Sequence, residues 1–399
     1  MSTWIWPLVI TLVLQVVSAF LSRLTPFLAP ILTAEAGISP ATVGYMAALN
    51  TAGSIAFLIA GAPLLRRAGP VRTLQIGVTA AGLGALLIAW PTAFNLYLAS
   101  FLIGIGYGPS PSAGSEILQR HAPARRRTVI FSIKQAGVPI GGVLGGVALP
   151  LFATGRWENA IYASTALALA AVITVQPSRE TIDKERDPRQ RLSLGAFASL
   201  RNLTAPIRAL GLSPSLPTLT AASFCFAIAQ GVLLAFFVTY MVVDIGLSLS
   251  IAAGLFAINQ AVSVFGRVLM GWIVDRAGSA ITPLRILSVA SAATTALLAL
   301  CDASWPLWTI ALLAAVSGIT IVSWNGIFLA EVARLTPPAH VGEASAGSTL
   351  LTFVGYVIGP AAFAALVDLS GSYRIGFFVV ILFSLSALIF LASLSRRNA

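Results

Sequence analysis

Long apolar stretches separated by short polar loops make up most of the chain. A helix that crosses about 30 Å of hydrocarbon needs roughly 20 apolar residues, and twelve stretches reach that length. Their expected ranges are 6–32, 41–63, 71–90, 94–118, 128–152, 157–176, 215–243, 249–273, 283–302, 304–332, 343–368 and 373–394. The pattern therefore predicts an all-α membrane protein with twelve transmembrane helices. The first stretch continues past Arg23 without an evident cleavage site, so we expect a span there and not a signal peptide.

The composition excludes an ordinary soluble protein. Of the 399 residues, 57% are hydrophobic and 9% are charged, which is too little charge to cover a soluble surface. The net charge of +11 does not indicate nucleic-acid binding, because the basic residues are scattered through short loops. Cys225 and Cys301 lie far apart within apolar stretches, so we expect no disulfide, no metal site and no cofactor.

The loops between the apolar stretches predict the orientation. Nineteen of the 24 Lys and Arg residues fall in loops on one side, whereas Arg156 and Arg374 fall on the other. Positive loops stay in the cytoplasm, so both termini are expected there. We expect a multi-pass protein of a bacterial cytoplasmic (inner) membrane, monomeric and in contact with membrane lipid.

A polar segment at 177–214 divides the chain into an N-terminal half, 1–176, and a C-terminal half, 215–399, with six spans each. Residues 193–210 fit two interpretations. One is a solvated linker. The other is an amphipathic helix on the membrane surface, with Arg201 and Arg208 toward the lipid headgroups.

The two halves repeat each other at an offset of 209 residues. The aligned segments run from Asn50 to Gly69 and from Asn259 to Gly278, and the loops before them, 35–39 and 244–248, match at the same offset. The identical pairs are Asn50/Asn259, Ala52/Ala261, Ser54/Ser263, Arg67/Arg276, Ala68/Ala277 and Gly69/Gly278. Duplicated six-span units are typical of secondary transporters.

With this duplication the chain resembles the major facilitator superfamily over essentially its whole length. The sharpest local mark is Gly271-Trp-Ile-Val-Asp275-Arg276-Ala-Gly278, which is similar to the gating motif of that superfamily. The first-half copy, 61–69, departs from the motif because Arg66 stands where the acid belongs. The resemblance implies a major facilitator fold and a gating role for Gly271, Asp275, Arg276 and Gly278. We add Glu116 and Glu331, at matching cytoplasmic helix ends, as further gates or caps.

Three cations lie within expected spans, Arg23, Lys134 and Arg267, and no carboxylate lies at comparable depth. A charge in the bilayer costs at least a few kcal/mol, so such residues are rarely without function. The repeat partner of Arg267 is Leu58, so the duplicated architecture does not require the charge. The string around Arg267 resembles the eighth helix of monocarboxylate and oxalate/formate transporters, which implies that Arg267 pairs with a substrate carboxylate. Ser263 stands where the monocarboxylate group tends to have an acid, which weakens transfer of its proton coupling.

Each cation has a structural alternative. Arg267 can bond backbone carbonyls or extend to the interface. Lys134 can pair with Glu116, and Arg23 can reach the outer headgroups. Further candidates for the substrate cavity are also explained by ordinary helix packing. These are Tyr107, Asn50, Asn259, Trp324, Asn325, Gln135 and Gln230.

The leading hypothesis is a secondary transporter that moves a small organic anion, a mono- or dicarboxylate, by alternating access. Its coupling would be exchange or proton-accompanied symport, so protons are a candidate partner. The main alternative is a drug/proton antiporter for hydrophobic compounds, favoured by a partial antiporter motif at 137–146 in which Val138 splits the usual Gly-Pro pair. The chain has no phosphate-binding Gly-x-x-x-x-Gly-Lys motif and no catalytic cluster, so we expect neither an ATP-driven pump nor an enzyme.

Overall fold

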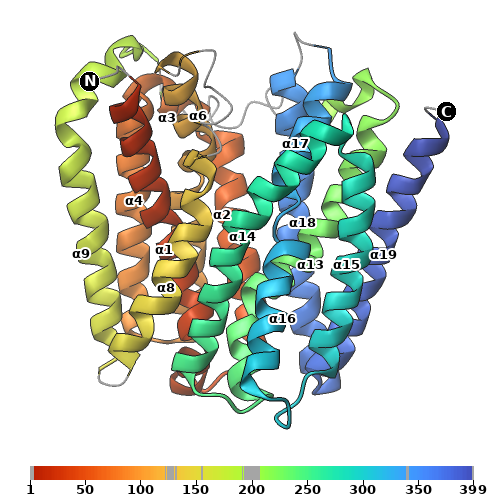
Figure 1. Ribbon diagram of the computed structural model, residues 1–399. Helices are drawn as coiled ribbons and strands as arrows, with labels where there is room; N and C mark the ends of the chain where they lie inside the picture. Colours follow the sequence, from red (N-terminus) through yellow and green to blue (C-terminus); the bar gives the residue numbers. More distant parts are fainter. Residues whose placement is uncertain are drawn as a thin grey trace. The chain divides into compact units, whose positions relative to one another are not determined.

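The computed structural model describes residues 4–121, 133–153, 156–190, 207–337 and 341–397, with the single residues 123, 130 and 192. These residues form helices and no strand, so the expected all-α fold is confirmed (Figure 1). Ten helical segments among them are long and apolar enough to cross a membrane. The fourth expected span holds two helices, α5 and α6, and the fifth holds α8. Residues 193–206 lie outside the described part, so both interpretations of 193–210 stay open, and Arg208 is exposed.

The chain forms two compact units. The N-terminal unit comprises Met1–Ile38 and Leu49–Ser199, and the C-terminal unit comprises Ser39–Ala48 and Leu200–Ala399. Helix α2 (Val43–Ala60) therefore gives its first residues to the C-terminal unit. A methyl group on Gly44 would collide with the backbone oxygen of Pro360 in that unit, so only glycine allows this close approach.

The N-terminal unit is a bundle of tightly packed helices. Helix α1 lies beside α8, and α4 lies beside α5 and α9. Small residues allow these approaches: a methyl group on Gly141 of α8 would lie 2.6 Å from the backbone oxygen of Val16 on α1. Besides α2, its α-helices are α1 (Ile5–Glu35), α3 (Ala62–Ala68), α4 (Pro70–Leu86), α5 (Ala93–Tyr107), α6 (Pro109–His121), α8 (Gly137–Ala153), α9 (Glu158–Val175) and α10 (Arg179–Ile182).

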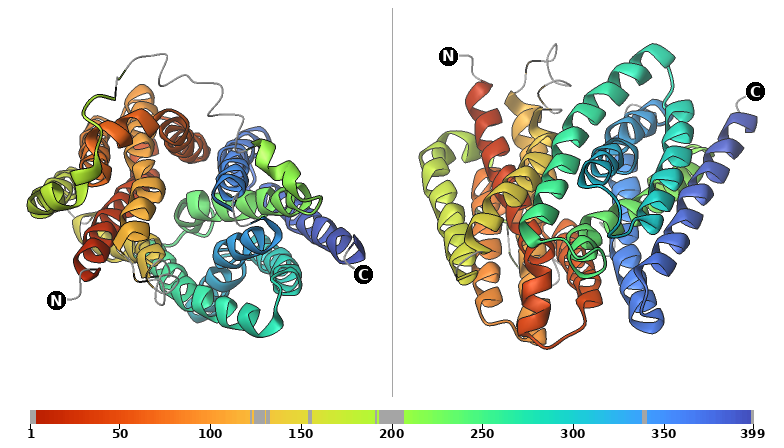
Figure 2. Two further views of the ribbon diagram at one scale, coloured as in Figure 1. Left: turned by 90° about the horizontal axis from the view of Figure 1, so that it is seen from above. Right: turned by 60° about the horizontal axis from the view of Figure 1, so that its bottom comes forward.

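In the C-terminal unit, α13 packs against α18 and α19, α15 against α19, and α14 against α16. Figure 2 shows the helices of this unit from above in its left view. An aromatic core joins α13 to the helix break after α16, where Phe226 stacks on Trp324 with ring centroids 5.2 Å apart. The α-helices of the unit are α13 (Leu216–Val243), α14 (Leu249–Ala277), α15 (Ile281–Leu300), α16 (Leu307–Thr320), α17 (Asn325–Leu335), α18 (Val341–Ser370) and α19 (Tyr373–Arg397).

Backbone geometry repeats at the same offset as the sequence. Gly37 and Gly246 have φ of 64° and 79°, and Gly69 and Gly278 have φ of 87° and 70°. L-residues with a side chain rarely adopt these values of φ, so glycine is favoured at each of the four positions. Positive φ therefore recurs at equivalent loop positions in both units, although ψ differs within the second pair, 161° at Gly69 and −5° at Gly278.

Helix crossings repeat as well. A methyl group on Gly104 of α5 would collide with the backbone oxygen of Asn50 on α2, and one on Gly318 of α16 with that of Asn259 on α14. The repeated Asn therefore marks a contact between the second and fourth span of each unit. Both fourth spans are also interrupted, at Gly108 between α5 and α6, and at 321–324 between α16 and α17.

Candidate functional site

The ammonium group of Lys134 is buried inside the N-terminal unit. Lys134 lies in the helical turn before α8, and its side chain is 2% exposed. Its Nζ donates a hydrogen bond to the backbone oxygen of Ser110 on α6 at 3.0 Å. No carboxylate of the described residues pairs with it, and Glu116 instead pairs with Arg120, one turn further along α6. The buried lysine thus keeps a positive group in a place where a counter-charge is lacking.

Helix α6 and the neighbouring α1 carry polar side chains with unused hydrogen-bonding atoms. Gln15 on α1 donates from Nε2 to Oε1 of Gln135 at 3.2 Å. Three buried oxygens make no hydrogen bond within the described part of the chain: Gln15 Oε1, Ser18 Oγ and Ser110 Oγ. Buried polar atoms are normally paired, so α1 and α6 hold more hydrogen-bonding capacity than the described residues use.

The two arginines lie in less enclosed positions. Arg23 on α1 and Arg267 on α14 are both half-buried. On α14, Arg267 stands between a buried face with Ser263 and Gly266 and a highly exposed apolar face with Phe265 and Val268. Arg267 thus lies at the edge between these two faces. This position fits both roles that the sequence predicted, contact with a substrate carboxylate and extension to the membrane interface.

The end of α14 carries the motif residues. The guanidinium carbon of Arg276 lies 3.6 Å from the centre of the Trp272 ring, a cation–π contact. Gly278 ends the helix with positive φ, and Gly271 has open space where a side chain would begin. The side chain of Asp275 lies outside the described atoms, so its gating role stays a prediction.

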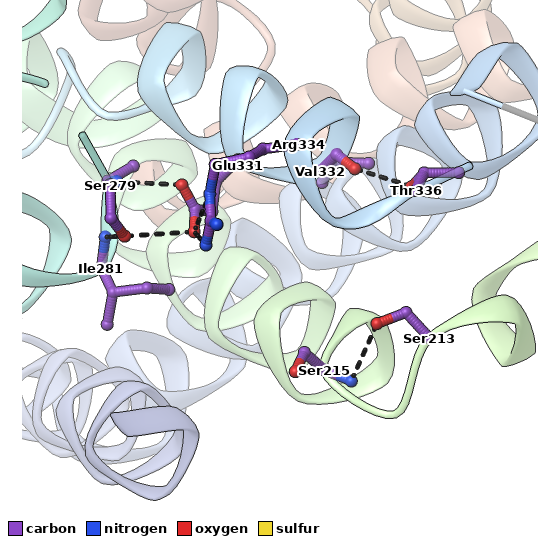
Figure 3. Close-up of polar contacts among 9 residues, drawn as sticks. Ser213, Ser215, Ser279, Ile281, Glu331, Val332, Arg334 and Thr336 are labelled. Carbon is purple, nitrogen blue, oxygen red and sulfur yellow. Dashed lines mark hydrogen bonds and ion pairs between the residues drawn. The ribbon is translucent and has the colours of Figure 1, made fainter. Parts of the chain in front are cut away.

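Glu331 on α17 caps the start of α15. Its side chain is 2% exposed, and its oxygens accept from the backbone N–H of Ala280 at 2.9 Å and the hydroxyl of Ser279 at 3.2 Å (Figure 3). Arg334, one turn later, forms an ion pair with it at 2.5 Å. A carboxylate at a helix N-terminus accepts hydrogen bonds from free N–H groups and interacts favourably with the helix dipole.

Asp183, which sequence reasoning missed, has the corresponding role in the N-terminal unit. Its side chain is fully buried, and its oxygens accept from the backbone N–H groups of Val71 and Arg72 at the start of α4. Burial raises the pKa of the Asp183 carboxyl above its ordinary 3.8, although the two backbone hydrogen bonds and Arg179 act in the opposite direction. No spacing pattern distinguishes Asp183 from the other charged residues of its polar segment.

Two of the polar candidates, Gln230 and Asn325, meet in one cluster of the C-terminal unit, and a third, Trp324, is next to Asn325 in the chain. Tyr356 on α18 donates to Oε1 of Gln230 at 2.9 Å, and Asn325 donates to the same oxygen at 3.4 Å. Trp324, beside Asn325, is fully buried. Sequence reasoning missed Tyr356, whose only signal is its place beside Gly355 in a glycine-rich stretch.

The other three candidates lie on α14, α2 and α5. The side-chain amide of Asn259 is fully buried and donates to α16, to the backbone oxygen of Ala314 at 3.2 Å and Ser317 Oγ at 2.8 Å. Asn50 lies half-buried at the equivalent crossing, and Tyr107 lies half-buried at the end of α5.

Among the described residues, ten apolar helices, an interrupted fourth span in each unit and a buried lysine without a carboxylate partner are typical of a multi-pass membrane protein. A family model described as Major Facilitator Superfamily matches residues 11–346. The chain therefore belongs to this superfamily, whose members are transporters and not enzymes.

Relatives and solved structures agree with this assignment. An uncharacterized MFS-type transporter of Mycobacterium tuberculosis is 27% identical over 86% of this chain and 74% of its own length. The 4-hydroxybenzoate transporter of Pseudomonas aeruginosa is 25% identical over 63% of this chain and 61% of its own, and the gallate transporter of Pseudomonas putida 25% over 67% and 64%. A bacterial homologue of the human lysosomal transporter Spinster, in an inward-facing conformation, superposes with a TM-score of 0.73 at 16% identity, covering 98% of this chain and 96% of its own.

Proposed function

We propose that this transporter carries a small organic carboxylate. The observation that carries the proposal is the Lys134 ammonium, 2% exposed, with no carboxylate partner among the described residues. A substrate carboxylate would supply the missing charge, and the unused hydroxyl of Ser110, whose backbone oxygen binds Lys134, could donate to it. Binding would then lower the cost of the buried cation.

Hydroxylated aromatic acids are the narrower substrate class to test first. Two relatives are named as transporters of 4-hydroxybenzoate and gallate, and both compounds join a carboxylate to phenolic hydroxyls. Lactate and oxalate represent the aliphatic mono- and dicarboxylates. Arg23 and Arg267 would add positive potential along the path of the anion, and the planar guanidinium of Arg267 is suited to hold a carboxylate with two hydrogen bonds.

The proposed transport cycle is alternating access, with the halves 1–176 and 215–399 as the moving parts. Its energy would come from exchange or from proton-accompanied symport. In this proposal a single chain suffices, both termini are cytoplasmic, and the membrane is the bacterial inner membrane. The loop residues Asp275 and Arg276, with the caps Glu331 and Glu116, would control the cytoplasmic gate.

The test compares the two lysines of the chain in proteoliposomes. Lys134→Met keeps the apolar stem and removes the charge, whereas Lys184→Met alters an exposed residue and serves as the control. We expect Lys134→Met to lower uptake of labelled carboxylates at least about tenfold, the factor for 1.4 kcal/mol of lost binding, and Lys184→Met to leave uptake unchanged. The probes are 4-hydroxybenzoate, gallate, lactate and oxalate.

Two results would contradict the proposal. One is normal carboxylate uptake by a folded Lys134→Met protein, with folding checked by thermal unfolding. The other is a wild-type protein that moves none of the four anions but moves lipophilic cations, which would favour the drug/proton antiporter.

A further inference from the structure

We propose that Gln230, Asn325 and Tyr356 form a neutral subsite that binds a hydroxyl group of the transported anion. This inference rests on the proposed function and narrows it to hydroxy acids. The three side chains come from α13, α17 and α18 of the C-terminal unit and meet at one atom, Gln230 Oε1. Asn325 Nδ2 also lies 3.3 Å from the Tyr356 hydroxyl oxygen, which closes the cluster.

The cluster leaves both a donor and an acceptor unused. Gln230 is 4% exposed, yet its hydrogen bonds within the described residues all involve Oε1, so its Nε2 donates to none of them. Asn325 uses only Nδ2, and its Oδ1 accepts no hydrogen bond from the described residues. An unused donor beside an unused acceptor matches a hydroxyl group, which both accepts and donates. A carboxylate would find only the donor.

The burial of the three residues differs in a way that suits a ligand. Gln230 is enclosed, whereas Asn325 and Tyr356 are half-buried, so the cluster has an enclosed end and an accessible side. Water competes little for a hydrogen bond made at the enclosed end. Such a bond therefore discriminates between an acid that carries the hydroxyl group and one that lacks it. None of the three side chains is charged, so the subsite would recognise the neutral part of an anion whose carboxylate is held elsewhere.

The helix break after α16 fixes Asn325 in place. Helix α16 ends at Thr320 and α17 begins at Asn325. The Trp324 backbone oxygen accepts from Phe328 N at 3.1 Å, and the Trp324 ring stacks on Phe226, one turn before Gln230 on α13. The rigid aromatic contact therefore sets the spacing between Asn325 and Gln230. The indole N–H of Trp324 is itself buried without a partner in the described residues, a further unused donor beside the cluster.

The experiment measures preference between acids that differ by one hydroxyl. Proteoliposomes with the full chain take up 4-hydroxybenzoate or benzoate in one pair and lactate or propionate in a second pair. We expect the wild type to prefer the hydroxy acid of at least one pair by about tenfold or more, because a site built to bond a hydroxyl rejects the analogue that lacks it. Tyr356→Phe and Gln230→Met should reduce this preference to near one while uptake of the parent acid persists.

The matched control is Ser223→Ala. The Ser223 hydroxyl bonds Thr352 at 2.9 Å and so joins the same two helices, α13 and α18, two turns before Gln230. Its loss should leave the preference unchanged, because it removes an interhelical hydrogen bond without touching the cluster. If Ser223→Ala loses the preference to the same extent, the preference depends on the contact between α13 and α18 and not on the cluster. This result would overturn the subsite.

The outcomes separate the two proposals. If the wild type takes up carboxylates without preference, the subsite is overturned and the proposed function stands. The same holds if Tyr356→Phe and Gln230→Met lose uptake of both acids of a pair in parallel. Failure of the wild type to carry any of the acids overturns the proposed function, and the subsite with it.

Discussion

Asp183 accepts a hydrogen bond from the backbone N–H of Val71 at 2.8 Å, so a side chain that follows α10 caps the start of α4. In the C-terminal unit, Glu331 of α17 caps α15 through Ala280 N at 2.9 Å. The two units thus hold equivalent helix starts with carboxylates from non-equivalent elements. The Arg66 that replaces the motif acid in the first half stands beside this capped turn, where its backbone oxygen accepts from Asp187 N at 2.9 Å.

Removing the first cap should destabilise the protein. Asp183→Ala leaves two N–H groups at the start of α4 without an acceptor, and loss of such a cap costs about 1–2 kcal/mol. Asp187→Ala is the control, because the side chain of Asp187 is exposed and accepts a hydrogen bond only from Arg189 N among the described residues, while the backbone bond to Arg66 is kept. Thermal unfolding in detergent should show a lower Tm for Asp183→Ala alone, and equal Tm values for the two variants would contradict the capping role.

The Asp183 carboxyl should also make the stability of the protein depend on pH. Burial raises the pKa of folded Asp183 above the ordinary 3.8, so the folded protein binds this proton more tightly than the unfolded chain. The contribution of Asp183 to stability is then largest below about pH 3.8, falls as the pH rises, and is constant above the folded pKa.

Asp183→Asn cannot ionise and should lack this decline. The Tm difference between Asp183→Asn and the wild type, followed from pH 4 to pH 8, should therefore move in favour of the variant as the pH rises. If the Tm of the wild type instead rises relative to that of Asp183→Asn, the N–H groups at the start of α4 stabilise the ionised carboxylate more than burial destabilises it.

Two repeat-related glycines differ in what a side chain would meet. Gly69 and Gly278 both have positive φ, so alanine is strained at either position, and more so at Gly69, whose ψ of 161° lies in a region that is essentially restricted to glycine, than at Gly278 with ψ of −5°. At Gly69 the added methyl group would also collide with Asp183, whereas at Gly278 nothing lies within 4 Å. Gly69→Ala should lower the free energy of unfolding more than Gly278→Ala does, as measured by thermal unfolding. The excess should shrink in an Asp183→Ala background, and an unchanged excess would contradict the steric contact.

The apolar pattern by itself determined the fold class. Hydropathy is a property of each segment, so the all-helical fold and most spans follow from local sequence. The repeat from Asn50 to Gly69 against Asn259 to Gly278 likewise indicated duplicated six-span units, because the two segments share residues at a constant offset. The cap at Glu331 was one of two roles proposed for that residue, and its position at a helix end was sufficient to suggest it.

Only the tertiary structure decided which polar atoms meet. Asp183 reaches α4 across 112 residues, and Tyr356 reaches Gln230 across 126, distances over which periodicity carries no information. The sequence predicted a lysine within a span and no carboxylate at its depth, but the bond from Lys134 to Ser110 depends on how α6 packs against the turn before α8. Hydrophobic burial along the chain selects the helices, whereas hydrogen-bond geometry between distant helices selects the sites.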